Sequence, residues 1–75
     1  MKVSNVCAKW LQEAKAVSSK LTDTSIHDDL IESMELQLAF ITKAEERNNN
    51  NDVMLHNNKF LKYASLHTRE FKQHF

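Results

Sequence analysis

Three histidines in the last third of the chain are the residues most able to bind a metal. His56, His67 and His74 are separated by eleven and seven residues, so on one helix they would fall near the same face. Metal ligands on a single helix need a spacing of three or four residues. With a rise of about 1.5 Å per residue, these side chains would stand roughly 16 and 10 Å apart, too far to share one ion. We interpret them as surface or boundary histidines, with a pH-sensitive interface as the alternative.

The candidates for nucleophile or acid–base chemistry are equally isolated. Cys7 has no histidine near it in the sequence, so we interpret it as a small buried apolar side chain. A catalytic thiol there would need a base that the fold brings close. The acids Asp28, Asp29, Glu32 and Glu35 lack the Glu-x-x-His motif of helical carboxylate metal sites. They are typical of a solvated acidic helix start, or of a docking patch for a partner.

Glycine and proline are absent from all 75 residues, where average usage would give roughly five and four. Without glycine there is no phosphate-binding loop, and no known nucleophile motif surrounds a serine. We therefore expect a protein that is not an enzyme and that binds no cofactor and no metal. Tight hairpins also favour glycine, so the missing residues disfavour a β-sheet and favour helices joined by polar turns.

Three stretches carry apolar residues at helical spacing, near residues 3–21, 24–47 and 52–74. They predict an all-α fold: a small antiparallel three-helix bundle, with a helical hairpin completed by dimerisation as the alternative. The expected core stripe of the first helix is Val3, Cys7, Trp10, Ala14, Val17 and Leu21, flanked by Val6, Leu11 and Ser18. Trp10 is expected to anchor the core, with a place at an interface as the alternative. That of the second helix is Leu30, Ile31, Met34, Leu38 and Ile41. That of the third is Val53, Asn57, Phe60, Ala64, His67 and Phe71.

Polar tracts separate the three stretches. Residues 22–25 are rich in helix-capping types, and Thr22 and Ser25 are the candidate caps of the second helix. Residues 48–51 are four asparagines, which tolerate the left-handed conformation and so predict a loop. Asp52 is the candidate cap of the third helix.

Size and charge bound the classes of function. A chain of 75 residues with 41% hydrophobic and 27% charged content predicts one folded domain spanning residues 1–75. The net charge of zero argues against a protein whose main task is to neutralise phosphates. One cysteine and the lack of a long apolar run favour a cytoplasmic protein without a membrane partner.

Four apolar residues lie off the predicted core stripes. Leu36 and Phe40 are one turn apart on another face of the second helix, and Leu55 and Leu66 lie almost opposite the stripe of the third. Exposed apolar clusters mark association sites. We therefore predict a small regulatory or adaptor protein that binds another protein through these residues, with a homodimer as one form of that binding.

Two other functions remain open. Lys59, Lys62, Arg69 and Lys72 share the outer side of the third helix, as the basic residues of a DNA-reading helix would. A DNA-binding transcriptional regulator is therefore the first alternative. The second is a small phage or mobile-element inhibitor of a larger protein machine, which the short length permits.

Overall fold

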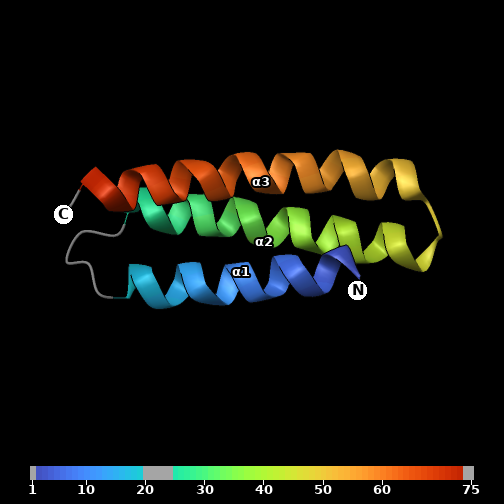
Figure 1. The fold of residues 1–75 in the computed structure, drawn as a ribbon, viewed down its shortest axis with the longest axis horizontal. Coiled ribbons are helices and arrows are strands. Elements are labelled where there is room, and N and C mark those ends of the chain that lie inside the picture. The colour runs from blue at the N-terminus through green and yellow to red at the C-terminus, as the bar shows by residue number, and fades with distance from the viewer. Residues whose placement is uncertain (1, 20–24, 74–75) are drawn as a thin grey trace.

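The computed structural model describes residues 2–19 and 25–73, and the side chains of 2–19 and 28–69. Within these ranges the chain forms three helices and no strand: α1 (Val3–Ser18), α2 (Ser25–Glu46) and α3 (Asn50–Gln73). Each helix packs against the other two, and successive helices run in opposite directions (Figure 1). The predicted all-α three-helix bundle is confirmed.

The ends of the helices differ somewhat from the expected ranges. α1 stops at Ser18 rather than at residue 21, and α2 begins at Ser25. α3 begins at Asn50 rather than at residue 52, so the predicted loop over 48–51 was too long and Asn50 and Asn51 are helical, because the helix is capped by Asn49. The candidate cap Thr22 and the stripe residue Leu21 lie outside the described residues.

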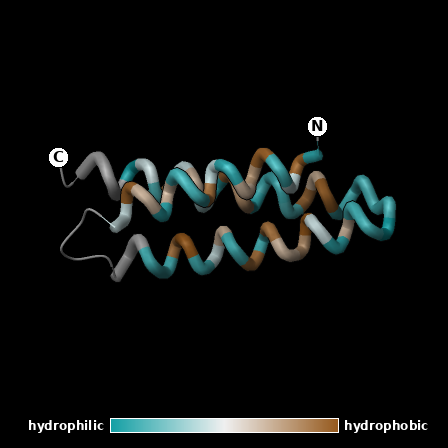
Figure 2. The backbone as a smooth tube through the Cα atoms, turned by 90° about the horizontal axis from the view of Figure 1, so that it is seen from below, coloured by the Kyte–Doolittle hydropathy of each residue, from teal (hydrophilic) through white to brown (hydrophobic). Residues whose placement is uncertain are grey.

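The asparagine tract ends α2 with a left-handed residue. Asn48 has φ 54°, the only positive value among the described residues. The Asn49 N–H donates to the carbonyl of Ala44 at 2.9 Å, and the Asn48 N–H donates to that of Glu45 at 3.1 Å. These two bonds form a Schellman motif, in which asparagine takes the place usually held by glycine. Figure 2 shows this turn as a wholly hydrophilic end of the bundle.

Asn49, rather than Asp52, caps α3. The Asp52 N–H donates to Asn49 Oδ1 at 3.2 Å, and Asn49 Nδ2 donates back to Asp52 Oδ2 at 2.9 Å. The sequence-based assignment of Asp52 as the cap was therefore wrong by three residues. Asp52 instead lies in the first turn, where its negative charge meets the positive end of the helix.

The first turn of α1 takes its partner from α2. Lys2 provides no side-chain cap, and the Ser4 N–H donates to Glu45 Oε2 at 3.3 Å. The hydrogen bonds from Ser4, led by its side chain, lower the pKa of Glu45, although partial desolvation acts in the opposite direction. One turn from the other end of α1, Lys15 Nζ lies 2.8 Å from Glu35 Oε1. Exposed pairs of this kind contribute about 0–1 kcal/mol.

The core lies between the three helices and is centred on Phe60, Met34 and Ile41, the largest fully buried side chains. The predicted stripe of α2 and the described part of the α3 stripe supply its walls, and the side chain of Phe71 lies outside the described residues. α1 contributes mostly small residues, as its buried members are Cys7, Leu11, Ala14 and Ser18. α1 is also shorter than its neighbours and leaves the turn end of α2 and α3 uncovered (Figure 1).

The predicted stripe of α1 was right at Cys7 and Ala14, which are buried, but wrong at Trp10 and Val17. Leu11 and Ser18 point into the core, whereas Trp10 is 37% exposed and Val17 is half-buried. Trp10 reaches Phe60 only at the edge of the core, with the ring centroids 6.4 Å apart and the planes at 77°. Trp10 is therefore a boundary residue rather than a core anchor.

The left-handed residue of the turn gives a first prediction. Asn48→Ala should lower the free energy of unfolding by about 1 kcal/mol, because a Cβ without a compensating side chain is disfavoured at positive φ. Asn48→Gly should keep the turn, since glycine reaches this conformation freely. Chemical denaturation measures both, with Asn51→Ala in the first turn of α3 as a control expected to change little. Equal stability of the Ala and Gly variants at position 48 would contradict the assignment.

The bond between Glu45 and Ser4 gives a second prediction. Because the pKa of Glu45 is lowered in the folded protein, its ionised form stabilises the fold above the ordinary value of 4.5. That contribution should be lost as the pH falls through the lowered folded-state pKa. The difference in unfolding free energy between wild type and Glu45→Gln should therefore be constant near neutral pH and shrink in acid. Glu46→Gln, the neighbouring exposed carboxylate, is the control, and the same acid dependence in both variants would refute the role of Ser4.

Candidate protein-binding surfaces

The described residues include seven large hydrophobic side chains that are substantially exposed. They are Val6, Trp10, Leu36, Phe40, Met54, Leu55 and Leu61. Helical spacing and the contacts between helices divide them between two faces of the bundle. The third face, between α1 and α2, carries the Lys15–Glu35 ion pair and none of the seven.

The first group forms what we call the α2–α3 face, made of Leu36, Phe40, Leu55 and Leu66. Leu36 is 54% exposed, Leu55 49% and Phe40 38%, and Leu66 is half-buried. All four residues predicted to bind a protein thus reach the surface, Leu66 least.

His56 joins the two helices beneath this face. The Phe40 ring stacks on the imidazole with the centroids 4.8 Å apart, and His56 Nδ1 lies 2.7 Å from Gln37 Oε1. Phe40 is therefore held in place by α3 although much of it is exposed. Gln37 is buried, and its position on the core side of α2 was missed because glutamine is a polar residue. The half-buried His56 matches the predicted boundary position.

The predicted basic residues share the outer side of α3 with this face. Lys59, Lys62 and Arg69 are all exposed, and the side chain of Lys72 lies outside the described residues. Leu55, Lys59, Lys62, Leu66 and Arg69 follow one another at steps of four and three. Apolar and basic side chains are therefore mixed along one stripe, rather than forming separate apolar and basic surfaces.

The second group forms what we call the α1–α3 groove, made of Val6 and Trp10 from α1 and Met54 and Leu61 from α3. Trp10, Met54 and Leu61 are 37, 65 and 38% exposed. This surface was not predicted from the sequence, because Trp10 was expected first in the core and only as the alternative at an interface. A useful signal was present in the sequence, since Met54 and Leu61 are seven residues apart and off the core stripe.

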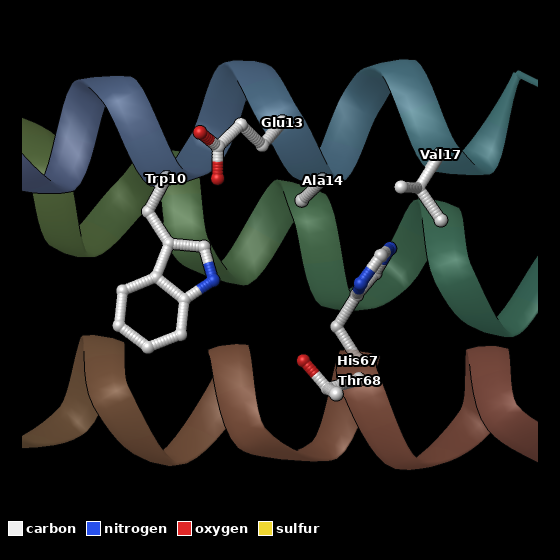
Figure 3. A pocket seen from close by; sticks show the side chains of 6 residues that line it. All are labelled: Trp10, Glu13, Ala14, Val17, His67 and Thr68. Carbon is white, nitrogen blue, oxygen red and sulfur yellow. The ribbon is translucent and has the colours of Figure 1, made fainter.

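A pocket of about 200 Å³ lies at the C-terminal end of this groove. Its lining residues are Trp10, Glu13, Ala14, Val17, His67 and Thr68. Figure 3 shows the Trp10 ring at one end and His67 toward the other, with the small side chain of Ala14 between them. The pocket therefore has apolar walls on α1, the polar side chains of His67 and Thr68 on α3, and one carboxylate beside it.

Two polar contacts join α1 to α3 inside the bundle. Ser18 Oγ lies 2.8 Å from His67 Nε2, and Cys7 Sγ lies 3.5 Å from Asn57 Oδ1. Burial, followed by the negative charge of Glu45, raises the pKa of the Cys7 thiol. Cys7 is thus held in its neutral form, which suits the predicted role of a small buried side chain.

The interpretation of His67 as a surface or boundary residue was wrong, because only 4% of it is exposed. The position of His67 on the predicted core stripe of α3 already indicated that this side chain is buried. A serine hydroxyl within hydrogen-bond distance of an imidazole is also the beginning of a nucleophile–base pair. Ser18 is equally buried at 4%, so the observed geometry suits a structural bond. His74 lies outside the described residues.

Among the described residues, no group of three His, Cys, Asp or Glu side chains is arranged to hold a metal ion. None of the helices, as far as they are described, is long and apolar enough to cross a membrane. In comparisons with known proteins, no family model, curated protein or solved structure matches the chain. Functional proposals therefore rest on the side chains themselves.

The Ser18–His67 contact gives a third prediction. Ser18→Ala removes the hydroxyl from a buried imidazole nitrogen, which should lower the free energy of unfolding by about 1–3 kcal/mol. Ser65→Ala, on the exposed side of α3, should change it far less. Thermal and denaturant unfolding of the two variants measure the difference, and equal effects would mean that the buried bond contributes nothing.

Proposed function

We propose that this chain is a small non-enzymatic regulator or adaptor that binds protein through the α2–α3 face, with a second copy of itself as the partner. The observation that carries the proposal is the exposure of Leu36, Phe40 and Leu55 on adjacent helices. Burying one such side chain is worth about 1.5–3 kcal/mol relative to leaving it in water. A domain of this size has little stability to spare, so covering these residues is favourable.

The charges beside the face favour a second copy as the occupant. α2 begins with the exposed acids Asp29 and Glu32, whereas the outer side of α3 carries Lys59, Lys62 and Arg69. The apolar residues of the α2–α3 face thus have negative charges on the α2 side and positive charges on the α3 side. Together with a net charge of zero, this makes the surface complementary to itself.

The direction of the helices favours a particular arrangement of the two copies. α2 and α3 are antiparallel, and Gln37 and Phe40 both contact His56. Along the helix axes, Glu32 therefore lies at nearly the same height as Lys62, and Phe40 at nearly the same height as Leu55. A two-fold axis parallel to the helices would lay α2 of each copy over α3 of the other while keeping these heights. Glu32 would then face the second copy's Lys62, and Phe40 its Leu55.

DNA binding is the second candidate, favoured by the exposure of Lys59, Lys62 and Arg69 along one side of α3. Two observations weigh against it. Leu66 interrupts the basic stripe and Leu55 lies directly before it, and the acids of α2 lie beside it. Both features would weaken contact with phosphates, because that contact depends on an uninterrupted positive field.

The fourth prediction tests the proposed function. The wild type should form dimers as its concentration rises, and Phe40→Glu should remain a helical monomer because it places a carboxylate at the apolar centre. Thr42→Glu is the matched control, since it adds the same charge at an exposed residue of α2 one heptad after Glu35, on the side that faces α1. Light scattering and circular dichroism at several concentrations give mass and folding together.

Charge exchange tests the arrangement within the same series. Glu32→Lys and Lys62→Glu should each weaken the dimer, and the double variant should regain part of the loss. A wild type that stays monomeric at every attainable concentration would refute self-association, as would equal effects of Phe40→Glu and Thr42→Glu. Adding duplex DNA to the same samples tests the second candidate. Binding that weakens steeply with salt and disappears in a Lys62→Glu, Arg69→Glu variant would favour DNA instead.

A further inference from the structure

The α1–α3 groove is bordered by side chains that repeat at the spacing of a helix-packing seam. On α1, Val6, Trp10, Glu13 and Val17 follow at steps of four, three and four. On α3, Met54, Leu61 and Thr68 follow at steps of seven. Two such seams side by side offer knobs and holes to a further helix, as in a four-helix bundle.

The two seams run in the same direction and in a fixed register. α1 and α3 are parallel (Figure 1), and the contacts Cys7–Asn57, Trp10–Phe60 and Ser18–His67 join residues that are 50, 50 and 49 positions apart in the sequence. The two helices therefore keep a nearly constant register from Val6 to Val17. At about 1.5 Å per residue this corresponds to roughly two heptads of an occupying helix.

The pocket of about 200 Å³ lies between the two seams and could receive one side chain of a docked helix. Ala14 is small, and Trp10 and Val17 stand on either side of it (Figure 3). One aliphatic side chain of a docked helix would fill the space and cover much of the Trp10 ring.

The charge at the pocket indicates the chemistry of the occupant. Glu13 is the one carboxylate among the lining residues, and its side chain lies beside the indole of Trp10 (Figure 3). A lysine or arginine next to the inserted apolar residue could pair with Glu13 and stack against the indole face. Another acid there would be repelled.

We propose that the α1–α3 groove is a docking site for an amphipathic helix of another protein, which inserts an aliphatic side chain between Trp10 and Val17 and places a basic side chain against Glu13. This site is separate from the α2–α3 face and stands or falls independently of it. It would allow a self-associated protein to recruit a second, different partner.

The probe is a synthetic, hydrocarbon-stapled helix of two heptads with Leu at its a and d positions, no aromatic residue, and one Lys beside the central Leu. A matched peptide carries Glu in place of that Lys. Trp10 is the only tryptophan of the chain, so its fluorescence reports from the site itself. The Lys peptide should produce a saturable blue shift, because it removes water from the indole. The Glu peptide should bind about threefold more weakly, the size expected of one partly exposed ion pair.

Protein variants locate the binding. Glu13→Lys should reverse the preference between the two peptides. Thr68→Leu should weaken both about tenfold, because a larger side chain at an exposed position of the lining occupies the pocket. Phe40→Glu should leave peptide binding unchanged, so that a failure of this site and a failure of the α2–α3 face can be told apart. Circular dichroism establishes that each variant is folded.

Three results would overturn the inference. The first is no spectral shift with either peptide, and the second is binding that Thr68→Leu and Glu13→Lys leave unchanged. The third is a blue shift that follows protein concentration without any peptide, which would assign the groove to a second copy of this chain.

Discussion

The packing of α2 against α3 around Phe60 is the contact on which the rest of the molecule depends. Phe60, Met34 and Ile41 are fully buried, and the Asn48 turn holds their two helices antiparallel. α1 then closes the core with small residues and attaches at its ends, through Glu45 at Ser4 and through Ser18 at His67. The contact between α2 and α3 therefore contributes more to the stability of the fold than the contacts of α1. A helix that buries few large side chains removes less apolar area from water.

The small contribution of α1 to the core explains why apolar residues remain at the surface. A short α1 can cover only one side of the α2–α3 pair, so Leu36, Phe40 and Leu55 stay exposed on the other side. Because α1 presents small side chains to the core, its tryptophan is displaced to the edge, where it borders the groove with Leu61. Both surfaces thus follow from one constraint: three amphipathic helices in 75 residues carry more apolar area than one core can bury.

The sequence predicted the helices, the asparagine turn and the core stripe of α3, because periodicity and conformational preference act locally. The prediction was wrong on α1, where two different sets of residues have the spacing of a buried stripe. Trp10 with Val17, and Leu11 with Ser18, both continue a seam through Cys7 and Ala14, and hydrophobicity alone favours the tryptophan. Only the fold shows that Ser18 finds a buried partner in His67, which makes the polar residue acceptable inside. The leucines of the α2–α3 face were easier to predict, because α2 and α3 each have a single set of residues with the spacing of a core stripe, and these leucines lie outside it.

The central claim is that the exposed apolar side chains are covered by self-association, and thermal unfolding of the wild type at widely different protein concentrations tests it most directly. A partner that binds the folded chain stabilises it by mass action. The unfolding temperature should therefore rise steadily from dilute to concentrated protein. An unfolding temperature that is independent of concentration over the whole range would contradict the account.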